Sequence, residues 1–184
     1  GACAALCIVC MQATSVNATQ FSLTIDANRQ LGPWNRFYEQ LISTDHMITM
    51  LHSFYGRNMQ NALRRGSTEC GFNYFRGHGI FNQDINLVDT NADGTLKLTW
   101  ATFDSIYDAA LALGLRPILE FSFTPPVMQS KPSIYLWYNN VSANTSLPKD
   151  LNKWRDLCDS VVRHCEGKYG VEEVRKWFFE VYNE

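Results

Sequence analysis

The chain has 184 residues, of which 46% are hydrophobic and 18% are charged, and its formal net charge is -2. This length suits one domain of ordinary size, and the composition is that of a globular protein rather than a disordered one. The charge is small and no basic stripe is present, which argues against a nucleic acid as partner. No apolar run in the sequence is long enough to cross a bilayer.

The first 18 residues, GACAALCIVCMQATSVNA, differ in composition from the rest of the chain. They carry no charge and end with Val16 and Ala18, which occupy positions -3 and -1 of a signal-peptidase site. This pattern predicts that residues 1–18 are the remnant of a clipped secretory signal, and that the protein is secreted or extracellular. A buried strand or helix is the alternative. We expect residues 19–184 to form the domain itself.

Strands and helices are predicted to alternate from here on. The apolar run MITMLHSF, residues 47–54, predicts a first strand, and a weaker helical pattern follows over residues 59–70. The run FNYFRGHGIF, residues 72–81, is almost continuously apolar, which is typical of a parallel strand covered on both faces.

The second half of the chain continues this alternation. TFDSIYDAALALG, residues 102–114, predicts a helix, and RPILEFSF, residues 116–123, predicts a strand. The clearest helix spans residues 147–170, where apolar residues recur at spacings of three and four and Asp150 can cap the start. KWFFEVYN, residues 176–183, predicts the last strand.

Cysteine and sequon patterns add little. Without the signal segment three cysteines remain, an odd number that implies no disulfide framework. Cys158 and Cys165 lie seven apart on one helical face and are interpreted as buried apolar residues. Sequons begin at Asn140 and Asn144, and they would matter only in a eukaryotic, secreted protein.

The alternating order predicts an α/β fold with a parallel sheet. A doubly wound nucleotide-binding fold requires a Gly-rich turn after its first strand, and SFYGRNMQ does not supply one. A barrel instead places function at the carboxyl ends of its strands, where this chain has His78, Pro125 and the pair Asn183-Glu184. Four strands make half of a (β/α)8 barrel, since a whole one needs about 250 residues. We therefore expect the N-terminal part, about four β/α units, of such a barrel.

Two motifs that could suggest metal binding are interpreted otherwise. DTNADG, residues 89–94, imitates the start of a calcium loop, but Trp100 stands where the loop needs a bidentate Glu. A hairpin turn is therefore predicted there. His46, His52 and His164 show no metal-ligand spacing and are interpreted as surface or packing residues.

The segment YFRGHGIF places three side chains, those of Tyr74, Arg76 and His78, on one face of a strand by its period of two. An Arg inside a barrel needs a carboxylate partner, because an unpaired buried charge is costly. Glu120 and Glu180 are the available partners, and a structural ion pair between Arg76 and Glu180 is favoured. His78 lies nearer the strand end and is better placed to contact a ligand.

In this order, RGHG, RPILEFSFTP, KYGVEEVRKW and FFEVYNE resemble glycoside hydrolase family 39, which contains β-xylosidases and α-L-iduronidases. The resemblance runs from about Leu31 to Glu184 and covers the N-terminal half of the family's catalytic barrel. The terminal Asn183-Glu184 matches an Asn-Glu-Pro signature, with Tyr182 replacing the usual Trp. RGHGIFNQD and FSFTP match the family's second-strand and third-strand motifs, whereas the loop before the long helix has extra residues near 143–146. The RGHG form favours β-xylosidase.

The resemblance implies a retaining O-glycosidase that acts on a glycoside or oligosaccharide, and it implies no metal or organic cofactor. It makes Glu184 the catalytic acid/base, and it makes Asn183, His78 and Arg76 substrate-binding residues. Asn183 would bond the sugar 2-hydroxyl, a contact that strengthens in the transition state. The family's nucleophile is a Glu on a later strand and has no counterpart in these 184 residues.

Without that nucleophile, we expect the chain made alone to be inactive, and its open sheet edges to make it prone to aggregate. A truncated, non-catalytic carbohydrate-binding or interaction protein is the alternative, with Trp34, Trp137 and Tyr138 stacking on sugar rings. A nucleotide-dependent α/β enzyme is disfavoured, since no phosphate-cradling loop is present. The oligomeric state is not fixed by the sequence.

Overall fold

The computed structural model describes residues 22–29, 31–33, 37–132, 135–136 and 142–183. The chain divides into two units, residues 1–35 and 36–184. In the first unit, the described residues are exposed and hold a turn in which the Asp26 carboxylate accepts a hydrogen bond from the Asn28 backbone N–H. The proposed signal segment, the aromatic residues Trp34, Trp137 and Tyr138, and Glu184 lie outside the described residues.

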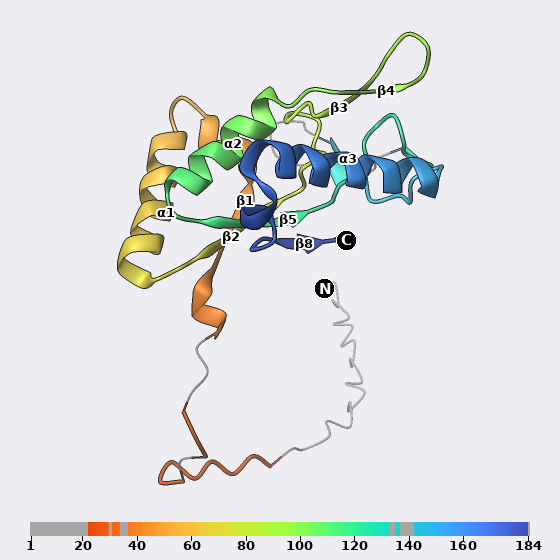
Figure 1. The fold of residues 1–184 in the computed structure, drawn as a ribbon. Coiled ribbons are helices and arrows are strands. Elements are labelled where there is room, and N and C mark those ends of the chain that lie inside the picture. The colour runs from red at the N-terminus through yellow and green to blue at the C-terminus, as the bar shows by residue number, and fades with distance from the viewer. Residues whose placement is uncertain (1–21, 30, 34–36, 133–134, 137–141, 184) are drawn as a thin grey trace, which may run out of the picture. The chain divides into compact units, whose positions relative to one another are not determined.

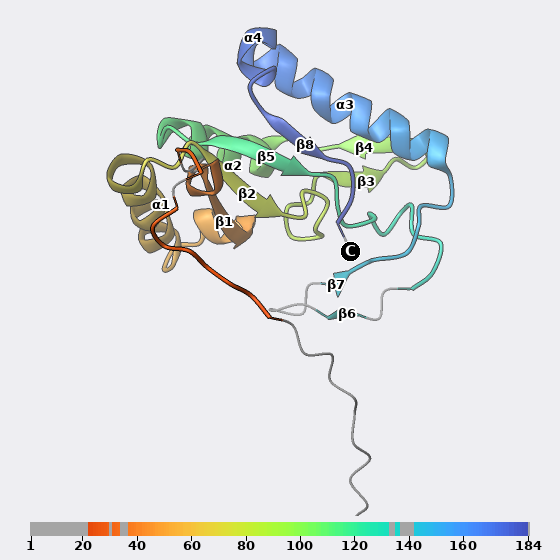
Figure 2. The same ribbon diagram turned by 90° about the horizontal axis from the view of Figure 1, so that it is seen from below.

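The second unit is built on a four-stranded parallel sheet, in which the strands stand side by side in chain order. They are β1 (Leu41–His46), β2 (Tyr74–His78), β5 (Arg116–Glu120) and β8 (Phe178–Glu180). The arrows of Figure 2 show their common direction. A sequential parallel order is that of consecutive strands in a (β/α)8 barrel, whereas a doubly wound sheet reverses its order at a switch point. The predicted fold class is confirmed.

The three long helices lie on one face of this sheet (Figure 1). They are α1 (Gly56–Cys70), α2 (Ala101–Ala112) and α3 (Leu151–Tyr169), and the short helix α4 (Val171–Val174) follows α3. The Asp150 carboxylate caps α3 as predicted, because it accepts hydrogen bonds from the backbone N–H groups of Asn152 and Lys153. None of the helices in the described ranges is long and apolar enough to cross a membrane.

Smaller elements fill the connections. They are the 3₁₀ helices η1 (Phe37–Gln40) and η2 (Met47–Leu51), the hairpin of β3 (Val88–Thr90) and β4 (Leu96–Leu98), and the pair β6 (Tyr135–Leu136) and β7 (Ser142–Ala143). The hairpin confirms the turn predicted within residues 89–94. Gly94 adopts a φ of 82° there, and the Asp93 carboxylate accepts a hydrogen bond from the Thr95 backbone N–H.

The strand predicted near residues 47–54, before the first helix, is present, but its placement on that run was wrong. The strand lies just before that run, and Met47–Leu51 forms η2 instead. Met47 and Met50 are both fully buried, and their spacing of three matches the period of a 3₁₀ helix. The apolar run is therefore buried as a helical turn. A short run of apolar residues is compatible with either a buried strand or a buried helical turn, so the sequence alone does not distinguish them.

Helix α1 also begins earlier than the predicted residue 59. Its first residue is Gly56, where an added Cβ would lie 2.6 Å from the Met50 carbonyl oxygen. Only glycine permits this close approach of the helix start to η2.

The two faces of the sheet have different chemistry, because successive side chains of a strand alternate between them. Phe75 and Leu119 point toward the helices and join a core with Phe103, Ile106 and Val161. The core also contains the fully buried Cys165, and burial raises the pKa of its thiol to about 12, which suits the predicted apolar role. The opposite face carries the charged residues.

Both sequons lie in the segment between β5 and α3, and the structure describes the one that begins at Asn144. The Asn144 side chain is buried, and its amide nitrogen donates hydrogen bonds to Gln129 Oε1 (2.8 Å) and to the Lys131 carbonyl oxygen (2.9 Å). Asn144 therefore has a structural role in the folded loop. Asn140 lies outside the described residues.

Gly77 of β2 gives a test of how tightly η2 packs. A Cβ at this position would lie 2.0 Å from the Met47 sulfur and 2.1 Å from its Cγ. We expect Gly77→Ala to lower the free energy of unfolding by about 1–3 kcal/mol, because the fully buried Met47 has to shift in a packed core. Equilibrium denaturation in urea measures this change.

Gly167→Ala is the matched control. Gly167 lies within α3 with nothing within 4 Å of an added Cβ, so the substitution should raise the free energy of unfolding by about 0.5–1 kcal/mol. An unchanged urea midpoint for Gly77→Ala would show that Met47 yields without cost.

Candidate active site

A cluster of charged side chains lies on the face of the sheet opposite the long helices. The Arg76 guanidinium on β2 contacts two carboxylates, one on each of the following strands. It lies 2.6 Å from Glu120 Oε2 on β5, and it makes a bidentate pair with Glu180 on β8, at 2.7 Å from Oε2 and 3.0 Å from Oε1. The predicted pair of Arg76 with Glu180 is confirmed, and Glu120 is a second partner.

His78 joins the same cluster. Its Nδ1 lies 2.9 Å from Glu120 Oε2, and its ring stands edge-on to Phe123 with ring centroids 5.0 Å apart. An ionised carboxylate can only accept, so the Nδ1–H of the imidazole donates to Glu120. The carboxylate and the aromatic ring thus hold the imidazole in one orientation at the end of β2.

Glu120 is the hub of this network and is fully buried. Burial is the largest influence on its pKa and would raise it, because a dry environment disfavours the charged form. Hydrogen bonds from His78 and from the Ser122 hydroxyl, together with the electrostatic influence of His78 and of the Arg76 guanidinium, outweigh burial and hold the pKa of Glu120 below its usual value. The carboxylate is therefore ionised at neutral pH.

A second network of hydrogen bonds supports the end of β2, where His78 lies. His46, at the end of β1, has its Nε2 2.5 Å from Asp84 Oδ2 and its Nδ1 3.2 Å from the Asn82 amide nitrogen. The Asn82 amide also donates to the His78 carbonyl oxygen, at 3.3 Å. His46 is thus a buried packing residue, one of the two roles expected for it. The residues Asn82 and Asp84 sit inside the RGHGIFNQD motif, but no spacing in the sequence pairs them with His46.

The last strand brings the chain end to the same edge of the sheet. Strands β2, β5 and β8 are parallel neighbours, so the residues that follow them lie at one edge. The Tyr182 hydroxyl lies 3.1 Å from Thr124 Oγ1, and its ring packs against Trp154 with centroids 5.9 Å apart. Asn183 follows and is half-buried, and Glu184 lies outside the described residues. The structure therefore brings Arg76 and His78 together through Glu120. The predicted roles of Asn183 and Glu184 in the site stay a prediction.

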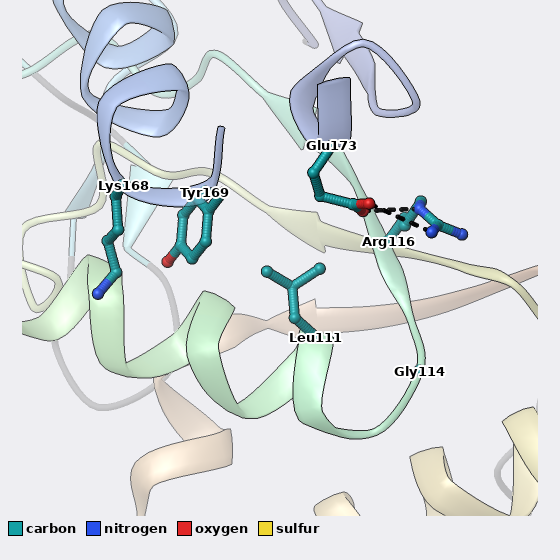
Figure 3. A pocket seen from close by; sticks show the side chains of 6 residues that line it. All are labelled: Leu111, Gly114, Arg116, Lys168, Tyr169 and Glu173. Carbon is teal, nitrogen blue, oxygen red and sulfur yellow. Dashed lines mark hydrogen bonds and ion pairs between the residues drawn. The ribbon is translucent and has the colours of Figure 1, made fainter. Parts of the chain in front are cut away.

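A hollow lies at the opposite, amino-terminal end of the sheet, where β5 begins (Figure 3). It has a volume of about 460 Å³ and is lined by Arg116, Lys168 and Glu173 among others. Its charges are already paired, since Arg116 Nε lies 2.7 Å from Glu173 Oε1 and Lys168 Nζ lies 3.1 Å from Asp108. The hydrogen bond that Arg116 donates to Glu173 also raises the pKa of Arg116. These pairs tie α4 to β5 and α3 to α2, which is a stabilising role.

Arg76→Met tests the cost of breaking the charged cluster. The substitution removes the cation and leaves the fully buried Glu120 and the partly buried Glu180 without it. We expect the free energy of unfolding to fall by about 3 kcal/mol, since an uncompensated buried charge remains. Urea denaturation at pH 7 measures the loss.

The control is Arg65→Met in α1, where Arg65 pairs with Glu69 across exposed side chains. That change should cause a much smaller loss of stability, because solvent screens a pair of exposed charges. Equal losses in the two variants would mean that the cluster contributes no more than a surface pair.

The depressed pKa of Glu120 predicts a dependence of stability on pH. The folded chain holds Glu120 ionised at pH values where the unfolded chain already protonates it, so the stabilisation is present above the usual Glu pKa of about 4.3. It is lost as the pH falls through the folded-state pKa. Urea denaturation between pH 7 and pH 3 should therefore show a smaller loss of stability for Glu120→Gln than for the unmodified chain. Parallel pH profiles of the two proteins would contradict this.

Comparisons with known proteins agree with the geometry. The family model described as "Glycosyl hydrolases family 39" matches residues 21–184. A beta-xylosidase of Caldicellulosiruptor saccharolyticus is 34% identical over 162 residues, which are 88% of this chain and 32% of that protein. A beta-xylosidase of Geobacillus stearothermophilus is 43% identical over 126 residues, which are 66% of this chain and 24% of that protein.

Solved structures give the same result. The crystal structure of a monomeric beta-xylosidase from Caulobacter crescentus superposes with a TM-score of 0.69 at 39% identity, and the match covers 83% of this chain and 29% of that one. The chain thus spans about a third or less of the length of these relatives. With the family model matching nearly all of its residues, the chain belongs to glycosyl hydrolases family 39.

Proposed function

We propose that this chain supplies the acid/base half of a retaining, β-xylosidase-like active site. Membership of a glycosyl hydrolase family implies a carbohydrate substrate. The observation that carries the proposal is the placement of His78 and the end of β8 at one edge of a barrel wall, which is where barrels bind their substrates. The similarity to beta-xylosidases supports the choice of sugar.

Under this proposal Glu184 is the acid/base, and Asn183 and His78 contact the sugar. In the first step the Glu184 carboxyl gives its proton to the glycosidic oxygen as the bond between that oxygen and the anomeric carbon breaks. A second carboxylate, from a later strand, forms the new bond to the anomeric carbon. In the second step Glu184 takes a proton from water, whose oxygen attacks the anomeric carbon and releases the nucleophile.

Arg76 acts through its neighbours in this scheme. Its guanidinium is engaged by Glu120 and Glu180, and Glu120 in turn accepts from His78. Arg76 is thereby a positioning residue that keeps Glu120 ionised and the imidazole oriented. The same pairing argues against Glu120 or Glu180 as the missing nucleophile, because a carboxylate bound by Arg is a weak nucleophile and is held in place.

Two further expectations stay proposals. Secretion is supported by the apolar, uncharged pattern of residues 1–18. The inactivity of the chain by itself is supported by the assignment of the nucleophile to a later strand. The alternative of a non-catalytic carbohydrate-binding protein depended on Trp34, Trp137 and Tyr138, which lie outside the described residues, and no observation favours it.

The proposal is tested by completing the barrel. The chain is joined to the downstream strands of the Geobacillus stearothermophilus relative and assayed with aryl β-xylosides, alongside the chain alone. We expect turnover only from the completed barrel. Glu184→Gln should lower kcat/KM about 10²–10⁴-fold for a poor leaving group, because proton donation is lost. The loss should be much smaller for a dinitrophenyl leaving group, which departs without a proton.

Glu172→Gln is the control, since Glu172 is an exposed carboxylate on α4, and it should leave kcat/KM unchanged. Equal losses for good and poor leaving groups would exclude Glu184 as the acid. Turnover of an aryl xyloside by the chain alone would overturn the assignment of the nucleophile to another part of the barrel.

A further inference from the structure

A small hollow lies beyond the ends of β2 and β5, between the segment that follows β2 and the segment that follows β5. Asn82, Gln83, Asn86 and Asp89 give it a polar wall, and Pro126 and Val127 give it an apolar one. Its volume is about 220 Å³. We call it the amide hollow, and it shares the functional edge of the sheet with His78.

We propose that the amide hollow is a second sugar-binding site, which takes one neutral monosaccharide unit. The choice of a sugar rests on the proposed function, whereas the existence of the site rests on the side chains described below.

The polar wall offers hydrogen-bonding capacity that the described residues do not use. Asn86 and Gln83 are exposed, and their carboxamides make no hydrogen bond to any described residue. Asn82 is 2% exposed, and its Oδ1 has no partner among the described residues although its amide nitrogen is used twice. This oxygen is itself buried, so the carboxamides open to a ligand in the hollow are those of Gln83 and Asn86.

The combination of groups suits a neutral polyol. Carboxamides both donate and accept hydrogen bonds, as hydroxyl groups require. Pro126 and Val127 present an apolar surface to the C–H face of a ring. The residues that line the hollow include no Lys, Arg or His, which disfavours an anion, and Asp89 is the one carboxylate, too little negative charge for a calcium site.

The size of the hollow limits the ligand. Pockets for drug-sized ligands have volumes of roughly 300–1,000 Å³, so about 220 Å³ suits a single ring rather than a chain of them. Asn82 also links the hollow to the candidate active site, because the same amide that lines it holds His46 and the His78 carbonyl. A sugar in the hollow would therefore lie beside the residue that supports His78.

The test is a titration of the ¹⁵N-labelled full chain with methyl β-D-xyloside, followed by NMR. The side-chain amide signals of Gln83 and Asn86 should shift and saturate with a dissociation constant on the order of 1–10 mM, as expected for so small a ligand. Cyclohexanol, which has a six-membered ring without the array of hydroxyls, should not produce these shifts.

The variant Gln83→Ala/Asn86→Gly should weaken binding at least about tenfold, because two hydrogen-bonding groups are removed. Glycine is chosen because Asn86 has a φ of 52°, which glycine adopts without strain. The Asn82 signals then report the remaining binding. Asn152→Ala, which removes an exposed carboxamide from α3, should leave the affinity unchanged.

Unchanged affinity in the double variant, or no saturation below about 100 mM methyl β-D-xyloside, would overturn the inference. A completed barrel that hydrolyses xylosides without sugar binding at the amide hollow would reject this site and leave the proposed function standing. Sugar binding at the amide hollow in a completed barrel without activity would support this site and reject the proposed function.

Discussion

The buried carboxylate of Glu120 is the constraint on which the candidate site depends. It lies in the middle of three neighbouring strands, and it is ionised only because Arg76, His78 and Ser122 surround it. A buried ion without partners is strongly destabilising, so moving any one of these groups away from the carboxylate would cost stability. Arg76 also pairs with Glu180, and this ion pair links β8 to the same network. One buried charge therefore positions residues that lie more than a hundred apart in the sequence.

The two faces of the sheet have different roles, one in packing and one in holding the charged network. The face toward the helices is closed by apolar packing, in which Gly77 makes room for Met47 and the η2 turn covers the end of β1. The other face carries the charged network and is where an α/β barrel places its interior. Rigidity on the first face is what allows ionised groups to be held at fixed distances on the second, since mobile neighbours would admit water and weaken each pair.

Much of this could be predicted from the sequence, and the exceptions have physical causes. The alternation of patterns predicted the parallel sheet, and the need of a buried Arg for a carboxylate partner predicted the pair of Arg76 with Glu180. The first strand was misplaced because residues 47–51 are apolar at a spacing that suits either a strand or a 3₁₀ turn. The pairing of His46 with Asp84 could not be predicted, because it joins residues 38 apart through the fold rather than through a repeat. Glu120 was named as one of two partners for Arg76, but its role as the hub depends on distances that no pattern contains.

The buried amide of Asn144 has a consequence for any cell that exports this chain. Its nitrogen is the atom to which an N-linked glycan would be attached, and in the folded loop that atom is committed to Gln129 and Lys131. Loop closure and the glycosylating enzyme therefore compete for one atom. In a eukaryotic secretory compartment, an attached glycan would replace one of the two N–H donors, so the folded loop would lose one of these two hydrogen bonds.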